Sequence, residues 1–144
     1  MSTTIRQILE RKPALYSVGP EATVLDALNV MADRNIGAVL VLDGDDIVGI
    51  FSERDYARKV VLYGKSSRDV PVCEVMTSQV VCADPAWSVH DCMAMMTERH
   101  VRHLPVVERG TLVGIISIGD VVSAVVSEQA TTIRSLEHYI ASGA

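Results

Sequence analysis

Two short stretches of the chain place a hydroxyl and a carboxylate at a spacing that suits ligand binding. Ser52-x-x-Asp55 follows the apolar run that begins at Gly49, and Ser117-x-x-Asp120 follows a matching run 65 positions later. An apolar run followed by Ser predicts a buried strand that leads into a helix, with the serine as N-cap and the aspartate in the first turn. The free N–H groups and the dipole of a helix start also favour a polar or anionic ligand. Each turn is therefore a candidate for capping and for binding.

Capping alone is the better explanation of a single Ser-x-x-Asp turn. Two such turns in register, each with a glycine ahead of it, favour ligand binding, and a serine can do both. A hydrolase is a weak alternative, because Gly114 lies one residue too far from Ser117 for a nucleophile elbow and Ser52 has no glycine two residues after it. The four histidines show no metal-ligand spacing. We therefore expect neither catalysis nor a metal site.

The composition limits the remaining classes of protein. The chain has 144 residues, of which 49% are apolar, and a net charge of −5, which predicts a globular domain. No basic cluster is present, so we expect no nucleic-acid partner. No apolar run approaches the roughly 20 residues of a membrane-spanning helix. Three cysteines without C-x-x-C spacing and an N-terminus unlike a signal peptide predict a cytoplasmic location.

Periodicity and turn residues predict the same order of elements in both halves of the chain. In the first half we expect a helix from Thr3 or Thr4 to about Arg11, an extended piece at 15–18, a helix from Thr23 to near Asn35, a hairpin of 39–42 and 47–51, and a helix at 52–62. In the second half we expect an extended piece at 80–82, a helix from Ser88, a hairpin of 104–107 and 111–116, a helix at 117–127, and a last helix at 131–140.

The two halves form an internal duplication. Residues 20–55 align without a gap on residues 85–120, and 11 of these 36 positions are identical. The predicted fold class is α+β, with two repeated β-α-β-β-α units packed face to face about a pseudo-twofold axis. We expect one module at 1–144, with repeat one at about 13–63, a linker at 64–71, repeat two at about 72–128 and a C-terminal helix at 131–141.

These features resemble the tandem cystathionine-β-synthase (CBS) domain pair, also called a Bateman module. The resemblance rests on the stretches Gly49–Asp55 and Gly114–Asp120 and on Arg102-His103-Leu104-Pro105-Val106-Val107 at the entry to a strand, and it covers nearly the whole chain. The sequence is most similar to small stand-alone bacterial members without a catalytic domain. The resemblance implies a homodimer that binds AMP, ADP, ATP or NAD, and in some members S-adenosyl compounds, in two clefts between the repeats.

The resemblance also implies roles for particular residues. It assigns Asp55 and Asp120 to ribose, whose vicinal diol offers two donors to a carboxylate. The ribose or phosphate contacts are assigned to Ser52, Ser117, Arg54, Arg102 and His103. The adenine pocket is assigned to Val18, Ile36, Gly37, Ala38, Val81 and Ile115.

The sequence thus predicts a regulatory sensor of energy or redox state, with a regulated enzyme or redox protein as its partner. The alternative is a dimeric adaptor that acts by protein contact and whose nucleotide clefts are vestigial. The two copies are not equivalent, because Arg54 aligns with Gly119 and the pair Arg102-His103 aligns with Gly37-Ala38. We therefore expect the two clefts to differ in affinity.

Overall fold

A computed structural model describes residues 3–12 and 15–143, and the chain in it divides into two compact units. The first-repeat unit is Ala14–Val81, and the second-repeat unit joins Met1–Pro13 to Cys82–Ala144. Each unit holds one copy of the repeat, so the mixed fold with two repeated strand-and-helix units is confirmed. The units are interleaved, because the segment that precedes the first repeat in sequence belongs to the second-repeat unit.

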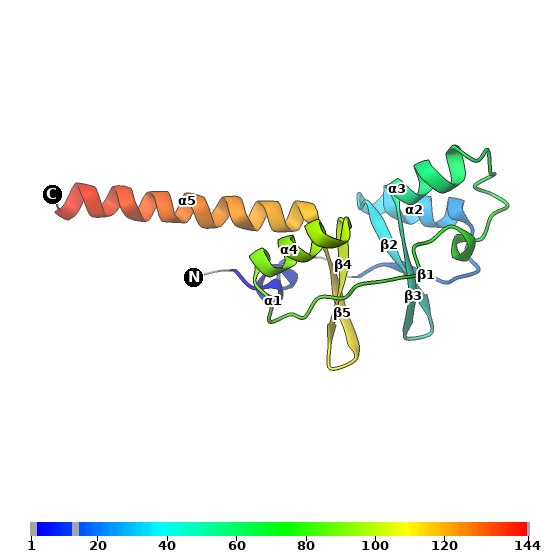
Figure 1. The fold of residues 1–144 in the computed structure, drawn as a ribbon, viewed down its shortest axis with the longest axis horizontal. Coiled ribbons are helices and arrows are strands. Elements are labelled where there is room, and N and C mark those ends of the chain that lie inside the picture. Colours follow the sequence, from blue (N-terminus) through cyan, green and yellow to red (C-terminus); the bar gives the residue numbers. More distant parts are fainter. Residues whose placement is uncertain (1–2, 13–14, 144) are drawn as a thin grey trace. The chain divides into compact units, whose positions relative to one another are not determined.

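The first-repeat unit is built on a three-stranded sheet in the order β1-β2-β3, with β1 parallel and β3 antiparallel to β2 (Figure 1). Its elements are β1 (Ser17–Val18), α2 (Val24–Arg34), β2 (Ala38–Asp43), β3 (Asp46–Ser52), α3 (Glu53–Asp55), the π-helix η1 (Tyr56–Val61) and the 3₁₀ turn η2 (Val72–Glu74). The helix expected at 52–62 is present, but most of it is a π-helix, a rare form that is enriched at functional sites.

Helix α2 follows its sequence signals closely. Thr23 is the N-cap, and its hydroxyl and the Asp26 carboxylate exchange hydrogen bonds with each other's backbone N–H at 3.1 Å. The helix ends at Asn35, which has a left-handed φ of 54°. Its buried face packs against the sheet and forms a core with residues that include Val24, Ala27, Met31, Val39, Val41, Phe51, Val60, Val72 and Val75. Local capping and periodicity therefore fix this helix.

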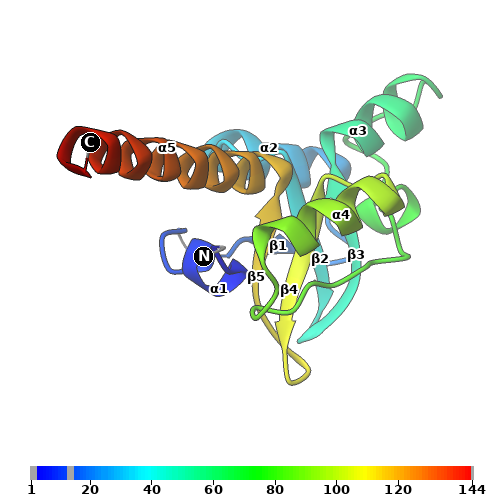
Figure 2. The same ribbon diagram turned by 60° about the vertical axis from the view of Figure 1, so that its left-hand side comes forward.

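The second-repeat unit repeats the plan with one strand fewer. Its elements are α1 (Ile5–Leu9), α4 (Val89–Arg99), β4 (His103–Glu108), β5 (Thr111–Ser117) and α5 (Ile118–Gly143). The β4–β5 hairpin shifts register between Val106 and Val107, the positions equivalent to the shift between Val41 and Leu42 in β2. Figure 2 shows α1 beside β5 and α4 near α5.

The extended piece expected at 80–82 is not a strand, and that prediction was wrong. Only Ala83 pairs with β4, as an isolated parallel bridge to Val106. The N–H of Ala83 donates to Pro105 O at 2.8 Å, so the backbone of Pro105 faces this segment. Because proline has no N–H to return a bond, the ladder cannot extend toward residue 81. In the first-repeat unit Leu40 takes this position, and there β1 forms.

The two helices expected at 117–127 and 131–140 are one continuous helix, α5. Nothing between them stops a helix, because Glu128, Gln129 and Ala130 are good helix formers and neither Gly nor Pro intervenes. The prediction of a separate last helix beginning at Thr131 was therefore wrong, and the Thr132 hydroxyl donates to Glu128 O at 3.0 Å within the continuous helix.

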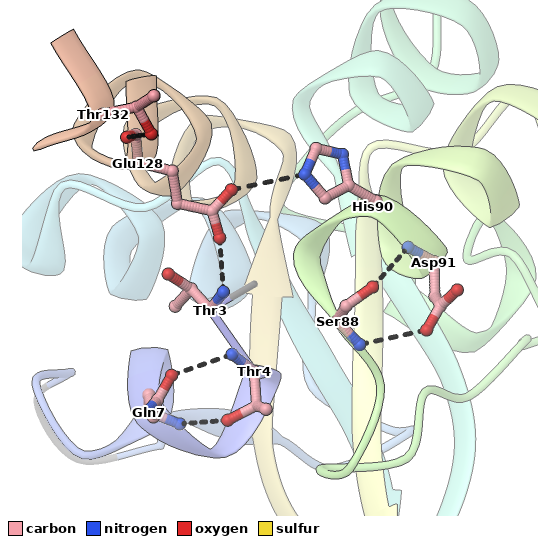
Figure 3. A network of polar contacts seen from close by, with 8 residues as sticks. All are labelled: Thr3, Thr4, Gln7, Ser88, His90, Asp91, Glu128 and Thr132. Carbon is pink, nitrogen blue, oxygen red and sulfur yellow. Dashed lines mark hydrogen bonds and ion pairs between the residues drawn. The ribbon is translucent and has the colours of Figure 1, made fainter. Parts of the chain in front are cut away.

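The N-terminal segment is anchored in the second-repeat unit by backbone and side-chain contacts (Figure 3). Thr4 caps α1 and forms an antiparallel bridge with Ser88, the N-cap of α4. The Glu128 carboxylate of α5 accepts a hydrogen bond from Thr3 N and lies 3.3 Å from His90 Nε2. Ile5 is fully buried. This anchoring brings residues 9–12 beside β5.

Candidate ligand-binding sites

In each unit a segment from outside the hairpin crosses the motif strand at its glycine. A Cβ on Gly49 would lie 2.4 Å from Met76 Sδ and 3.0 Å from Thr77 O, and a Cβ on Gly114 would lie 2.7 Å from Leu9 Cδ2. Only glycine allows such a close approach. The glycines of the two motifs therefore make room for segments that carry further polar groups to the aspartates.

Asp55 is held by donors from three directions. Its Oδ2 accepts from Ser52 N and Ser52 Oγ at 3.0 Å, and its backbone N–H donates to Ser52 Oγ at 3.2 Å. Its Oδ1 accepts from Thr77 Oγ1 at 3.0 Å and lies 3.0 Å from Lys59 Nζ. Only 7% of the residue is exposed. Burying a carboxylate is costly without hydrogen bonds, and here Ser52 and Thr77 supply them, with Lys59 as a partly exposed counter-charge.

Lys59 reaches Asp55 from one turn further along the helix, in the π-helical segment η1. Its side chain is 42% exposed, so water screens the ion pair from one side. Thr77 comes from a segment outside the hairpin and forms two backbone bonds to Ile50 of β3, at 2.8 and 2.9 Å. The Thr77 hydroxyl and the Lys59 ammonium thus share Oδ1.

Asp120 occupies the equivalent position in the second-repeat unit with a different partner. Its Oδ2 accepts from Ser117 N at 2.8 Å and from Lys12 Nζ at 2.6 Å, and Lys12 Nζ also donates to Ile115 O at 2.8 Å. The side chains of Asp120 and Lys12 are 25% and 27% exposed. Burial raises the pKa of Asp120, but the hydrogen bonds and charge of Lys12, together with those from Ser117, outweigh it and leave that pKa below its ordinary value.

Thr77 and Lys12 are structural counterparts that sequence analysis missed. Each contacts the same residue of its motif strand, Ile50 or Ile115, as well as the motif aspartate. They are also 65 positions apart, the spacing of the repeat. This spacing could have found them, because the alignment at 20–55 can be extended across residues 12 and 77.

The structure places most of the other predicted residues beside one motif or the other. Ala38 pairs with Ser52 across the β2–β3 hairpin, and Glu53 N donates to Gly37 O at 3.1 Å. The equivalent contacts in the second-repeat unit are His103 with Ser117 and Ile118 N with Arg102 O at 2.8 Å. The small residues thus lie at one aspartate and the basic residues at the other.

The remaining predicted residues are more dispersed. Ile36 and Val18 pack against the core of the first-repeat unit, and Ile115 is half-buried in β5. Arg54 is exposed in the first turn after Ser52. Val81 lies at the end of the first-repeat unit and outside any strand, so its place in an adenine pocket stays a prediction.

Among residues 3–12 and 15–143, no group of three or more His, Cys, Asp or Glu side chains is placed to hold a metal ion. No helix in the described part of the chain is both long and apolar enough to cross a membrane.

Comparison with known proteins gives one consistent result. The CBS domain model matches residues 3–62 and 72–127. The mitochondrial CBS domain-containing protein CBSX3 of Arabidopsis thaliana is 37% identical over 152 residues, which cover 99% of this chain and 74% of that protein. The structure described as a signal-transduction protein with CBS domains from Burkholderia ambifaria is 51% identical, with a TM-score of 0.84 over 88% of this chain and 96% of that one. A CBS-domain-containing protein from Agrobacterium tumefaciens is 40% identical, with a TM-score of 0.80 over 86% and 94%.

Proposed function

The chain belongs to the CBS domain family, and we propose that it is a regulatory module that binds AMP, ADP, ATP or NAD. In this proposal it acts as a homodimer that controls an enzyme or a redox protein, and it performs no catalysis itself. The observation that carries the proposal is the pair of aspartates, each at the start of a helix and each bonded to the backbone N–H of a serine three residues earlier.

Ribose would bind by replacing donors that the protein now supplies. The 2′ and 3′ hydroxyls of a ribose can donate to the two oxygens of one carboxylate. At Asp55 they would displace the exposed Lys59 from Oδ1 and share the oxygen with Thr77. At Asp120 they would displace Lys12, whose ammonium would then be available for a phosphate of the same ligand. The protein therefore exchanges an internal ion pair for ligand contacts at both positions.

The inequality of the two positions supports different ligands. Asp120 lies close to Lys12 and beside the strand that begins at His103, whereas the backbone beside Asp55 is lined by Gly37 and Ala38. We propose that the position at Asp120 prefers the more highly phosphorylated nucleotide. The position at Asp55 would then discriminate less on phosphate charge.

Titration calorimetry with the four nucleotides tests this function. We expect binding that Asp55→Asn and Asp120→Asn each reduce at one position, because the amide keeps the shape but loses the charge and one acceptor. Asp26→Asn and Asp91→Asn are matched controls, since these aspartates form the same capping box with Thr23 and Ser88 away from both motifs. Absence of binding in the wild-type protein, or unchanged binding in both motif variants, contradicts the proposal.

The adaptor alternative has an observation of its own in its favour. Both aspartates are already satisfied by groups of the same chain, and large apolar side chains are exposed on α5 and at residues 61–63. A protein that acts only by contact would keep its partner when both aspartates are replaced by asparagine. Co-purification of a partner with the double variant but no nucleotide binding by the wild type would select this function.

A further inference from the structure

The C-terminal half of α5 does not pack against the rest of the second-repeat unit in the described part of the chain. The first turns of the helix are packed, with Val121 fully buried and Ala124 and Val125 half-buried. From Gln129 to Ala141 every residue is exposed, and Figure 1 shows the helix continuing well past α1 and α4. An isolated helix of about 12–15 residues is only marginally stable in water. The exposed half of α5 therefore needs a stabilising contact, and its residue pattern indicates which kind.

The exposed apolar residues of α5 follow a heptad repeat. Positions a are Val126, Ile133 and Ile140, which are 58%, 55% and 66% exposed. Positions d are Val122, Gln129 and Leu136, and the two apolar ones are 50% and 57% exposed. The b, c and f positions between Ser127 and His138 are polar: Ser127, Glu128, Thr131, Arg134, Ser135 and His138. We call the a and d residues from Val122 to Ile140 the α5 seam.

A narrow apolar seam with a 3–4 spacing is the pattern of a coiled coil, whereas a helix that packs on a globular core shows a wider apolar face. Covering the exposed parts of the apolar seam residues and of the flanking Tyr139 on two helices would remove on the order of 1,000 Å² from water, about the lower limit for a specific interface. The seam is therefore long enough to hold one more helix of the same kind.

The residue types on the seam specify a second copy of this chain, in parallel orientation. All three a positions are β-branched and one of the three d positions is Leu136, and β-branched residues at a with Leu at d favour two parallel strands. Gln129 is the single polar residue on the seam, and in a parallel, in-register pair it faces Gln129 of the second copy, so that each amide can donate to the other and accept from it. In an antiparallel pair it would face an apolar residue and lose its hydrogen bonds. Glu137, at an e position, would face Thr132 of the second copy, so no like charges oppose each other.

We propose that residues 122–140 of α5 form a parallel two-stranded coiled coil that joins two copies of the chain, with Gln129 setting the register. This rests on the homodimer of the proposed function and specifies its contact, but it is independent of nucleotide binding. The coiled coil would stabilise the exposed half of α5 and fix the two copies side by side with the same direction.

Sedimentation of the full chain tests the contact. Ile133→Glu/Leu136→Glu should raise the dimer dissociation constant by about 100-fold or more, because four apolar side chains leave the interface of each dimer. It should also lower the helical circular dichroism, since the released half of α5 melts. Thr131→Glu/Ser135→Glu is the matched control on the outer face and should change neither. A dimer of unchanged affinity in the seam variant overturns the proposal.

Disulfide crosslinking tests the orientation. In a background with Cys73→Ser and Cys82→Ser, Gln129→Cys should form an interchain disulfide in high yield on mild oxidation, whereas Thr131→Cys should not. Equal yields at both positions, or none at position 129, overturn the parallel arrangement. Calorimetry on the seam variant separates the two proposals: we expect it to bind nucleotide as the wild type does, and a wild type that dimerises without binding nucleotide would refute the proposed function alone.

Discussion

Asp55 and Asp120 occupy the same position in two copies of one scaffold, yet the chain neutralises them in different ways. Asp55 is nearly buried and takes its contacts from a threonine and from a lysine on its own helix. Asp120 is a quarter exposed and is paired with Lys12, from a segment more than a hundred positions away. A duplicated motif therefore conserves the carboxylate and its capping serine, while the identity of the third partner sets the local charge.

Removing each carboxylate should reveal the difference in burial between the two aspartates. Asp55→Ala should cost about 3 kcal/mol in unfolding free energy, because it removes the acceptor from three partly buried donors of Ser52 and Thr77. Asp120→Ala should cost about 1–2 kcal/mol, since water can reach the groups that it abandons. Urea unfolding measures both, with Asp26→Ala as a capping control. Equal losses at the two positions would contradict the difference in burial.

The second test concerns the glycines that let the crossing segments approach. Gly49→Ala should cost about 1–3 kcal/mol, because the new methyl group meets the side chain of Met76 and also the backbone oxygen of Thr77. Gly114→Ala meets only the flexible end of Leu9 and should cost less than about 1 kcal/mol. Thermal unfolding of the two variants checks the order. A larger loss at Gly114 would show that the crossing at Leu9 is the tighter one.

The ion pair between Asp120 and Lys12 should make the stability of the fold depend on pH in the acid range. The pKa of Asp120 is lowered in the folded protein, so its ion pair stabilises the fold above the ordinary carboxyl pKa of 3.8, and this contribution is lost as the pH falls from there through the folded pKa. Lys12→Met removes the largest lowering influence. It should cost about 1 kcal/mol at neutral pH, with the deficit shrinking in acid.

Carbon-13 NMR of the Asp120 carboxyl measures this effect directly. The midpoint of its titration should move to higher pH in Lys12→Met, because burial then acts with less opposition. Lys65→Met, at an exposed position in the other unit, is the control and should leave the midpoint unchanged. An unshifted midpoint in Lys12→Met would mean that Lys12 does not pair with Asp120 in solution.

The smallest expected effect is at Lys59. Its ion pair with Asp55 joins residues one turn apart and is open to water, so Lys59→Met should change the unfolding free energy by only about 0.3–0.5 kcal/mol. Chemical unfolding with and without 0.5 M salt, roughly the range that screens exposed pairs, should show the difference disappearing in salt. A loss as large as that of Asp55→Ala would make Lys59 the main counter-ion.

Features that depend on neighbouring residues could be predicted from the sequence, whereas contacts between distant segments could not. The capping boxes at Thr23 and Ser88, the two hairpins and the paired motif turns were predictable, because each depends on residues a few positions apart. Thr77 and Lys12 were not predicted, since they lie outside the aligned repeat, although their separation of 65 positions matches the repeat offset and could have indicated them. Pro105 prevents a third strand beside β4, whereas Leu40 at the equivalent position of β2 allows β1 to pair. This could not be predicted, because it depends on which edge of β4 the preceding segment lies against. The continuity of α5 could have been predicted from the absence of any helix breaker between Ser127 and Thr131.

The interleaving of the units also sets an order in which the two sites can form as the chain leaves the ribosome. The Thr77–Asp55 bond closes over 22 positions, whereas the Lys12–Asp120 bond closes over 108. For a flexible chain the longer closure costs about 1.4 kcal/mol more in entropy. The first site can assemble once Thr77 has emerged, while residues 3–12, synthesised earlier, must wait for β5 and α5. The second-repeat unit is therefore completed last, although its N-terminal segment is synthesised before the first-repeat unit.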